Sequence, residues 1–146
     1  MVANDIQVGG KHYRSEYQHW DWVTNIGMGY LAGQVTKYLY RWRNKNGVQD
    51  LEKAGHFLDK LIEVSPIIVF EQRQSHFHRV WIEAETRAFF EANDISGPER
   101  VICVILANWA SKTELHDARN VLSELVTEAK LTARTEPPKD RAVAKG

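Results

Sequence analysis

The chain has 146 residues, of which 43% are hydrophobic, and its 19 basic and 19 acidic side chains give a formal net charge of zero. This length predicts one domain that can bury a core without disulfides, and a single cysteine, Cys103, excludes an internal disulfide. No apolar run approaches the ~20 residues of a membrane span, and the first residues lack a signal-peptide pattern, so we expect a cytoplasmic protein without a membrane partner.

Hydrophobic periodicity predicts helices throughout the first half of the chain. A short helix is expected over residues 16–25, with Trp20 and Val23 facing the core. The next helix is predicted from an apolar stripe of five residues: Leu31, Val35, Tyr38, Leu39 and Trp42. After a turn at residues 44–47, a third helix is predicted from a similar stripe: Leu51, Ala54, Leu58, Leu61 and Ile62.

Three further helices are predicted in the second half. One ends near Asn93 and has the stripe Phe77, Trp81, Ala84 and Ala88. The next starts at a capping box, Ser96-Gly97-Pro98-Glu99. Its residues Val101, Ile105 and Trp109 are predicted to face the core. The last covers about residues 113–130 on Leu115, Ala118, Leu122, Leu125 and Ala129. We therefore expect an all-α, single-domain bundle of five to six helices over residues 1–131 and a disordered tail over 132–146.

Familiar catalytic motifs are absent from the sequence. There is no GxxxxGK[ST] phosphate loop, no GxGxxG after a strand, no HExxH and no GxSxG. His76 and His78 have the spacing of two metal ligands, but no companion cluster follows them, so we predict no metal centre.

The strongest electrostatic feature is the segment 34–46, which holds four cations and no acid: Lys37, Arg41, Arg43 and Lys45. Lys37 and Arg41 are four residues apart, so they lie on one helix face. Lys45 and Lys53 can approach the same region from the turn and from the next helix. The pattern indicates either a phosphate clamp built of side chains or a solvated basic face with surface ion pairs.

Asp50 also has two interpretations. It is either an acid that caps the first turn of its helix, or a carboxylate that orients a ligand hydroxyl, accepts a proton or holds Mg²⁺. His12 and Tyr13 either cover a bound base or fix the N-terminal arm. Three aromatic residues are assigned to the core rather than to base stacking, because they fall on or near apolar stripes: Tyr38, Trp42 and Phe57.

These residues resemble the motifs of the small SaV-like phage family over residues 8–62. The shared pattern is Gly10-x-His12-Tyr13, then Gly33-Gln34-Val35-x-Lys37-Tyr38-x-x-Arg41, then Lys45-Asn46-Gly47-x-x-Asp50-Leu51-x-Lys53-Ala54-x-x-Phe57-Leu58. The chain departs from the family at Gln34, where Asn is usual, and at Phe57, where Tyr is usual.

The resemblance implies a phage protein of the host bacterial cytoplasm, related to a phage nucleotide kinase that phosphorylates deoxynucleoside monophosphates without a Walker loop. It makes four cations candidate phosphate ligands: Lys37, Arg41, Lys45 and Lys53. Asp50 becomes the candidate for hydroxyl or metal contacts, and with Lys37 and Arg41 it forms the catalytic set. Substrate contacts are also implied for His12 and Tyr13, over the base or sugar, and for Gln34.

We therefore expect a homo-oligomeric protein that binds a mononucleotide or another phosphorylated small molecule. The first hypothesis is a nucleoside monophosphate kinase-like phosphotransferase, whose cofactor would be Mg²⁺. A non-catalytic protein that sequesters a nucleotide, for example in counter-defence, needs the same clamp without the transfer chemistry. A nucleic-acid-binding accessory protein is less favoured, because such proteins usually have a strongly basic domain. A pyrophosphohydrolase would need two acidic pairs on facing helices and is less favoured, because the candidate pair Glu91-x-x-Asp94 lies near a helix end.

Overall fold

The computed structural model describes residues 16–65 and 76–135. Within these ranges the chain forms six α-helices and one 3-10 turn: α1 (His19–Asn25), α2 (Tyr30–Arg41), η2 (Trp42–Asn44), α3 (Val48–Val64), α4 (His76–Asn93), α5 (Gly97–Asn108) and α6 (Lys112–Thr135). No β-strand occurs in the described ranges, which confirms the predicted all-α class. None of the helices described there is both long and apolar enough to cross a membrane.

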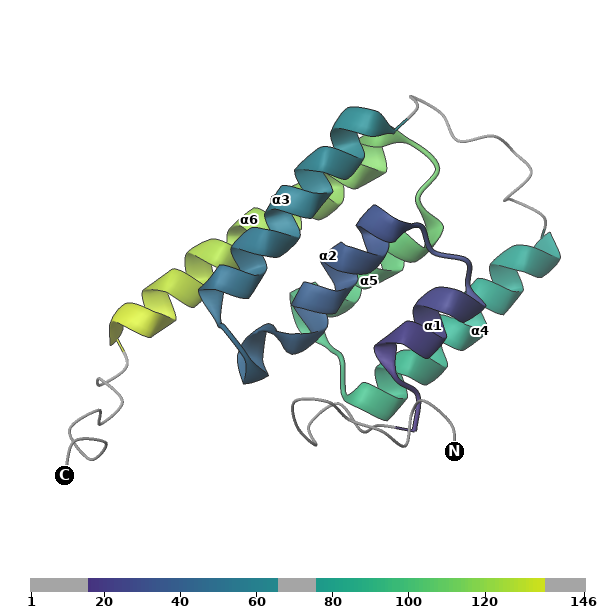
Figure 1. Ribbon diagram of the computed structural model, residues 1–146, viewed down its shortest axis with the longest axis horizontal. Helices are drawn as coiled ribbons and strands as arrows, with labels where there is room; N and C mark the ends of the chain where they lie inside the picture. The colour runs from purple at the N-terminus through teal and green to yellow at the C-terminus, as the bar shows by residue number, and fades with distance from the viewer. Residues whose placement is uncertain (1–15, 66–75, 136–146) are drawn as a thin grey trace.

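The six helices form two layers of three (Figure 1). The N-terminal half supplies one layer, in which α2 lies between α1 and α3, and the C-terminal half supplies the other, in which α5 lies between α4 and α6. Each helix of the first layer packs on one of the second, so that α1 lies on α4, α2 on α5 and α3 on α6. Two halves of the sequence therefore bury their apolar faces against each other.

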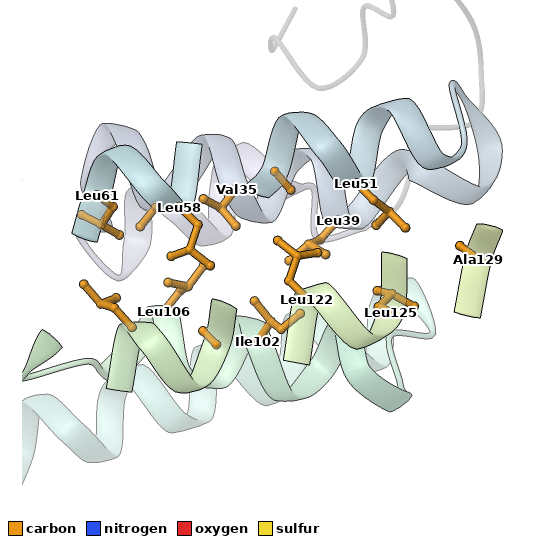
Figure 2. Close-up of a cluster of buried hydrophobic side chains, with 14 residues drawn as sticks. Val35, Leu39, Leu51, Leu58, Leu61, Ile102, Leu106, Leu122, Leu125 and Ala129 are labelled. Carbon is orange, nitrogen blue, oxygen red and sulfur yellow. The ribbon is translucent and has the colours of Figure 1, made fainter. Parts of the chain in front are cut away.

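The larger core lies between α2 and α3 on one side and α5 and α6 on the other (Figure 2). The predicted stripe of α6 is buried at all five positions, and α3 buries Leu51, Ala54, Leu58 and Leu61 from its predicted stripe. Both predictions are confirmed. They succeed because each of these helices has one apolar face and a charged opposite face, so only one orientation of the helix buries its apolar side chains.

A second core lies between α1 and the α4–α5 pair. It is built from Trp22, Ile26, Ile82, Phe89, Phe90 and Cys103. Trp22 is fully buried, stacks on Phe89 with ring centroids 4.5 Å apart, and donates from Nε1 to Thr86 Oγ1 at 3.0 Å. The short α1 helix is thus held mainly by one indole ring.

The predicted inward face of α4 is wrong, and those of α1 and α5 are correct only in part, since Val23, Ile105 and Trp109 are partly buried against the two cores. Trp20 is 50% exposed, Phe77 84% and Val101 48%, and Ala84 and Ala88 on α4 are also exposed. The side chains that replace them inside are Trp22 on α1, Ile82 and Phe89 on α4, and Ile102 on α5. The helix α4 has two apolar faces on opposite sides, and periodicity alone does not tell which one packs inward.

One predicted capping box and one predicted helix end also need correction. Ser96 precedes α5 as predicted, but it forms no side-chain capping bond. Glu99, the other half of the predicted capping box, instead accepts hydrogen bonds from Trp42 Nε1 at 3.3 Å and Arg43 Nε at 3.0 Å. The helix α6 continues to Thr135, so residues 132–135 of the predicted tail are helical. Residues 136–146 lie outside the described ranges.

The two tryptophans of α1 provide a test of this packing. We expect Trp22→Ala to lower the free energy of unfolding by about 3–5 kcal/mol, because it empties a fully enclosed site. Trp20→Ala, in which a half-exposed ring is removed, should cost less than about 1 kcal/mol. Urea unfolding of both variants measures the difference, and equal losses would contradict the observed orientation of α1.

Candidate functional site

The candidate site forms where α2 passes through η2 and a tight turn into α3. Gly47 has a φ of 58°, a left-handed conformation that glycine adopts without strain, and its N–H donates to Trp42 O at 2.9 Å. This turn returns the chain directly alongside α2. Side chains at the end of α2 and at the start of α3 are therefore brought together.

Asp50 joins the two sides of this turn. Its side chain is completely buried, and it accepts from Arg41 Nη2 at 3.2 Å, from Asn46 N at 3.2 Å and from Asn46 Nδ2 at 3.4 Å. Arg41 itself is 20% exposed. The contacts of Asp50 are thus structural, as in the first of its two predicted interpretations. They differ from a helix cap, because they reach the turn before α3 and the cation at the end of α2.

The charge state of Asp50 follows from these contacts. Burial by itself raises the pKa of the carboxyl group, but the hydrogen bonds from Arg41 and Asn46 and the positive charge of Arg41 outweigh burial. The pKa of Asp50 therefore lies below its ordinary value. Both carboxylate oxygens are occupied, so this group reaches a ligand hydroxyl or a Mg²⁺ ion only if the turn rearranges.

Three of the four predicted phosphate ligands converge on one aromatic ring. Arg41 Cζ lies 4.7 Å from the centroid of the Tyr38 ring, Lys37 Nζ lies 5.5 Å from it, and Lys53 Nζ lies 5.6 Å from it. The Tyr38 ring is half-buried and stacks on Phe57, with centroids 5.8 Å apart and planes inclined by 15°. We call these five residues the Tyr38 cluster.

An exposed aromatic ring extends the Tyr38 cluster along α2. Tyr30 is 71% exposed and meets Phe57 edge to face, with ring centroids 6.5 Å apart. Tyr30, Phe57 and Tyr38 thus form a row that crosses from α2 to α3 and back. Sequence reasoning missed Tyr30, although its spacing of eight residues from Tyr38 places both rings on one side of α2.

The remaining predicted site residues lie elsewhere. Lys45 is exposed in the turn after η2, and Arg43 of the same basic segment pairs with Glu99. Gln34 is half-buried on α2, one helical turn before Tyr38. His12 and Tyr13 lie outside the described ranges. The structure thus gathers Lys37, Arg41 and Lys53, with Asp50 directly behind Arg41.

One donor of the Tyr38 cluster has no acceptor among residues 16–65 and 76–135. Arg41 Nε is buried and forms no hydrogen bond within the described part of the chain. Neither Lys37 nor Lys53 has a carboxylate of the described residues within 4.0 Å, so Asp50 is the one acid paired to the cluster there. The cluster therefore has excess positive charge and an unsatisfied donor, a combination suited to an anion.

A half-buried imidazole lies close to the same helix. His19 Nε2 is 2.8 Å from Thr36 Oγ1, and its ring stacks on Tyr40 with centroids 6.0 Å apart. Because the Thr36 hydroxyl donates to Gly33 O, it accepts from His19, whose Nε2 therefore carries a proton. Burial, assisted by the charge of Lys37, lowers the pKa of His19 to about 4.

No group of three or more His, Cys, Asp or Glu side chains in residues 16–65 and 76–135 is arranged to hold a metal ion. Within that part of the chain, α2 and α3 bring three cations and three aromatic rings together on one face. Cations beside aromatic rings are groups that suit a phosphate and a flat ring.

Comparison with known proteins bears on the same region. The model of a family described as proteins of unknown function (DUF3310) matches residues 9–59. This range contains every residue of the Tyr38 cluster together with Asp50. No curated protein and no solved structure matches the chain.

The buried ion pair gives the first prediction for this site. Asp50→Asn removes the counter-charge of Arg41, and we expect a loss of about 2–3 kcal/mol in the free energy of unfolding, because a partly buried guanidinium is left unpaired. The matched control is Asp59→Asn, whose exposed pair with Arg119 should contribute less than about 1 kcal/mol. If the two variants unfold at the same urea concentration, Asp50 does not hold the turn, and its ligand-binding interpretation is favoured.

The second prediction concerns pH. An unfolded histidine has a pKa of 6.5 and the folded His19 a pKa of about 4, so the unfolded chain binds the extra proton between these values. The free energy of unfolding should therefore fall by up to about 3 kcal/mol from this group as the pH drops from 6.5 to 4. Urea unfolding at several pH values should show a flatter dependence in His19→Gln. The exposed control His56→Gln should retain the dependence of the parent, and an unchanged slope in His19→Gln would refute the assignment.

Proposed function

We propose that the protein binds a mononucleotide on the face formed by α2 and α3, with the phosphate at the Tyr38 cluster. The observation that carries this proposal is the convergence of Lys37, Arg41 and Lys53 on one half-buried ring. Three cations from two helices repel one another, and among the described residues only Arg41 has a buried counter-ion. A phosphate group offers the missing charge and accepts hydrogen bonds from several donors at once.

The aromatic row supports a nucleotide over a bare phosphate. Tyr30 presents an exposed ring next to Phe57, in continuation of the phosphate-binding residues. Stacking of a nucleic-acid base on an aromatic side chain contributes about 1–3 kcal/mol and accepts any base. The geometry therefore favours recognition of a phosphate and a flat ring, with little basis for choosing among bases.

Binding has stronger support than phosphoryl transfer. The resemblance of residues 8–62 to the SaV-like phage family suggests a nucleotide kinase relative, and transfer chemistry rests mainly on positioning and charge neutralisation. The cations of the Tyr38 cluster fit the second requirement. However, Asp50, the carboxylate that the resemblance assigns to catalysis, is fully buried and bonded to Arg41 and Asn46. Sequestration of a nucleotide needs no free carboxylate and is the simpler proposal.

Calorimetric titration with the four deoxynucleoside monophosphates tests the proposal. Lys53→Ala should weaken binding by about 10- to 150-fold, because each charge-assisted contact contributes about 1.5–3 kcal/mol. Lys130→Ala, which removes a half-exposed lysine on α6 that pairs with Glu52, should leave the affinity unchanged. Equal affinities of the two variants would remove the Tyr38 cluster from the site.

A product assay separates the two forms of the proposal. The protein is incubated with a bound monophosphate, a nucleoside triphosphate and Mg²⁺, and the nucleotides are then separated by chromatography. Binding without diphosphate product supports sequestration, whereas formation of a diphosphate that Lys53→Ala abolishes supports a kinase. Binding of oligonucleotides in preference to monophosphates would contradict both.

A further inference from the structure

The helix α4 has an apolar face that no described part of the chain covers. Phe77, Trp81, Ala84 and Ala88 follow one another at intervals of four, three and four residues. Phe77 is 84% exposed and Trp81 is 44% exposed, and Val80 beside them is 51% exposed. The opposite face of α4 is buried through Ile82, Thr86, Phe89 and Phe90. Exposed apolar patches of this kind typically mark an interaction surface.

The intervals are those of a helix-pairing seam. Spacings of four and three residues repeat with a period of 3.5, which keeps one stripe facing a partner helix along its whole length. A helix that packed only within its own domain would need no second stripe. The sequence pattern thus indicates that this face packs against another helix.

We propose that the partner is a second copy of this chain, with the two α4 helices packed antiparallel. The face has its large rings, Phe77 and Trp81, in the N-terminal half and its small side chains, Ala84 and Ala88, in the C-terminal half. In an antiparallel pair each ring meets an alanine of the partner, and the volumes match. In a parallel pair ring would meet ring and alanine would meet alanine, which leaves clashes beside gaps.

The helix dipoles favour the same orientation. Antiparallel packing places the positive end of each helix dipole beside the negative end of the other, whereas parallel packing would place like ends together. Arg79 lies on the opposite side of α4 from Phe77 and Trp81, so it brings no positive charge into this contact.

Trp81 is already held in place for this contact. Its Nε1 donates to Asn25 O at the end of α1, at a distance of 3.2 Å. This bond fixes the indole while much of the ring stays exposed, so little side-chain freedom is lost when a partner covers it. The 18 residues of α4 span only about 27 Å, which is short for a standard interface of ~800 Å² per partner, so we expect a dimer of micromolar affinity.

Sedimentation velocity over a range of concentrations tests the proposal. The parent protein should approach twice the chain mass of 16.8 kDa at high concentration. Ala84→Glu places a charge in the middle of the seam and should abolish the dimer, with an unchanged melting temperature at dilutions where the parent is monomeric, because Ala84 is exposed. The matched control, Ala133→Glu at an exposed alanine of α6, should still dimerise. A parent that stays monomeric, or a dimer that survives Ala84→Glu, overturns the proposal.

Two further variants test the partner and the orientation. A mixture of Ala84→Glu with Ala84→Lys should restore dimers, since opposite charges then meet near the centre of the pair. If neither variant alone nor the mixture associates, Ala84 does not lie at the centre of the contact. Phe77→Cys should form no disulfide-linked dimer under oxidation, because antiparallel helices keep the two positions apart. Efficient cross-linking at Phe77→Cys would show a parallel pair and overturn the orientation.

Discussion

The buried ion pair between Arg41 and Asp50 is the interaction on which the first layer of the structure depends. It closes the turn between α2 and α3, and these two helices then supply one wall of the larger core. A buried carboxylate requires compensation, which here comes from a guanidinium and two donors of Asn46. The same closure brings Lys53 of α3 to the ring of Tyr38 on α2. The Arg41–Asp50 ion pair therefore supports both the packing of α2 on α3 and the arrangement of the candidate site.

The two-layer arrangement separates the candidate site from the outer face of α4. The Tyr38 cluster belongs to α2 and α3, whereas α4 packs on α1 and α5 (Figure 1). Pairing of α4 with a second copy would leave the α2–α3 face open. The proposed nucleotide binding and the proposed self-association can therefore be tested one at a time, since no residue of the Tyr38 cluster lies on α4.

The sequence predicted the fold best where a helix has a single apolar face. For α3 and α6 the charged side excludes any other orientation, and the predicted core residues are correct. For α1, α4 and α5 two apolar faces compete, and the choice depends on contacts far along the chain, such as that of Trp22 with Thr86. No local pattern contains this information. The outward stripe of α4 was predicted as core because it has the period of a buried face.

Local period also explains which site residues could be predicted. Lys37 and Arg41 share a face of α2 because they are four residues apart, whereas Arg43 falls in the 3-10 turn and points to Glu99 instead. The approach of Lys53 depends on the turn at Gly47, which the sequence signals. The burial of Asp50 could not be predicted, because an acid in the first turn of a helix is ordinarily exposed and its partner lies on another helix.

Arg41 takes part in both the fold and the candidate site. One nitrogen of its guanidinium binds Asp50, its plane lies near the Tyr38 ring, and its Nε has no acceptor among the described residues. Asp50 keeps Arg41 in position but offsets part of its positive charge, and an anion reaches the buried Nε only if a neighbouring side chain moves. Loss of Arg41 would therefore disturb folding and binding together. Lys37 and Lys53 have no such structural partner in that part of the chain, and for this reason they, more than Arg41, can show whether the face binds phosphate.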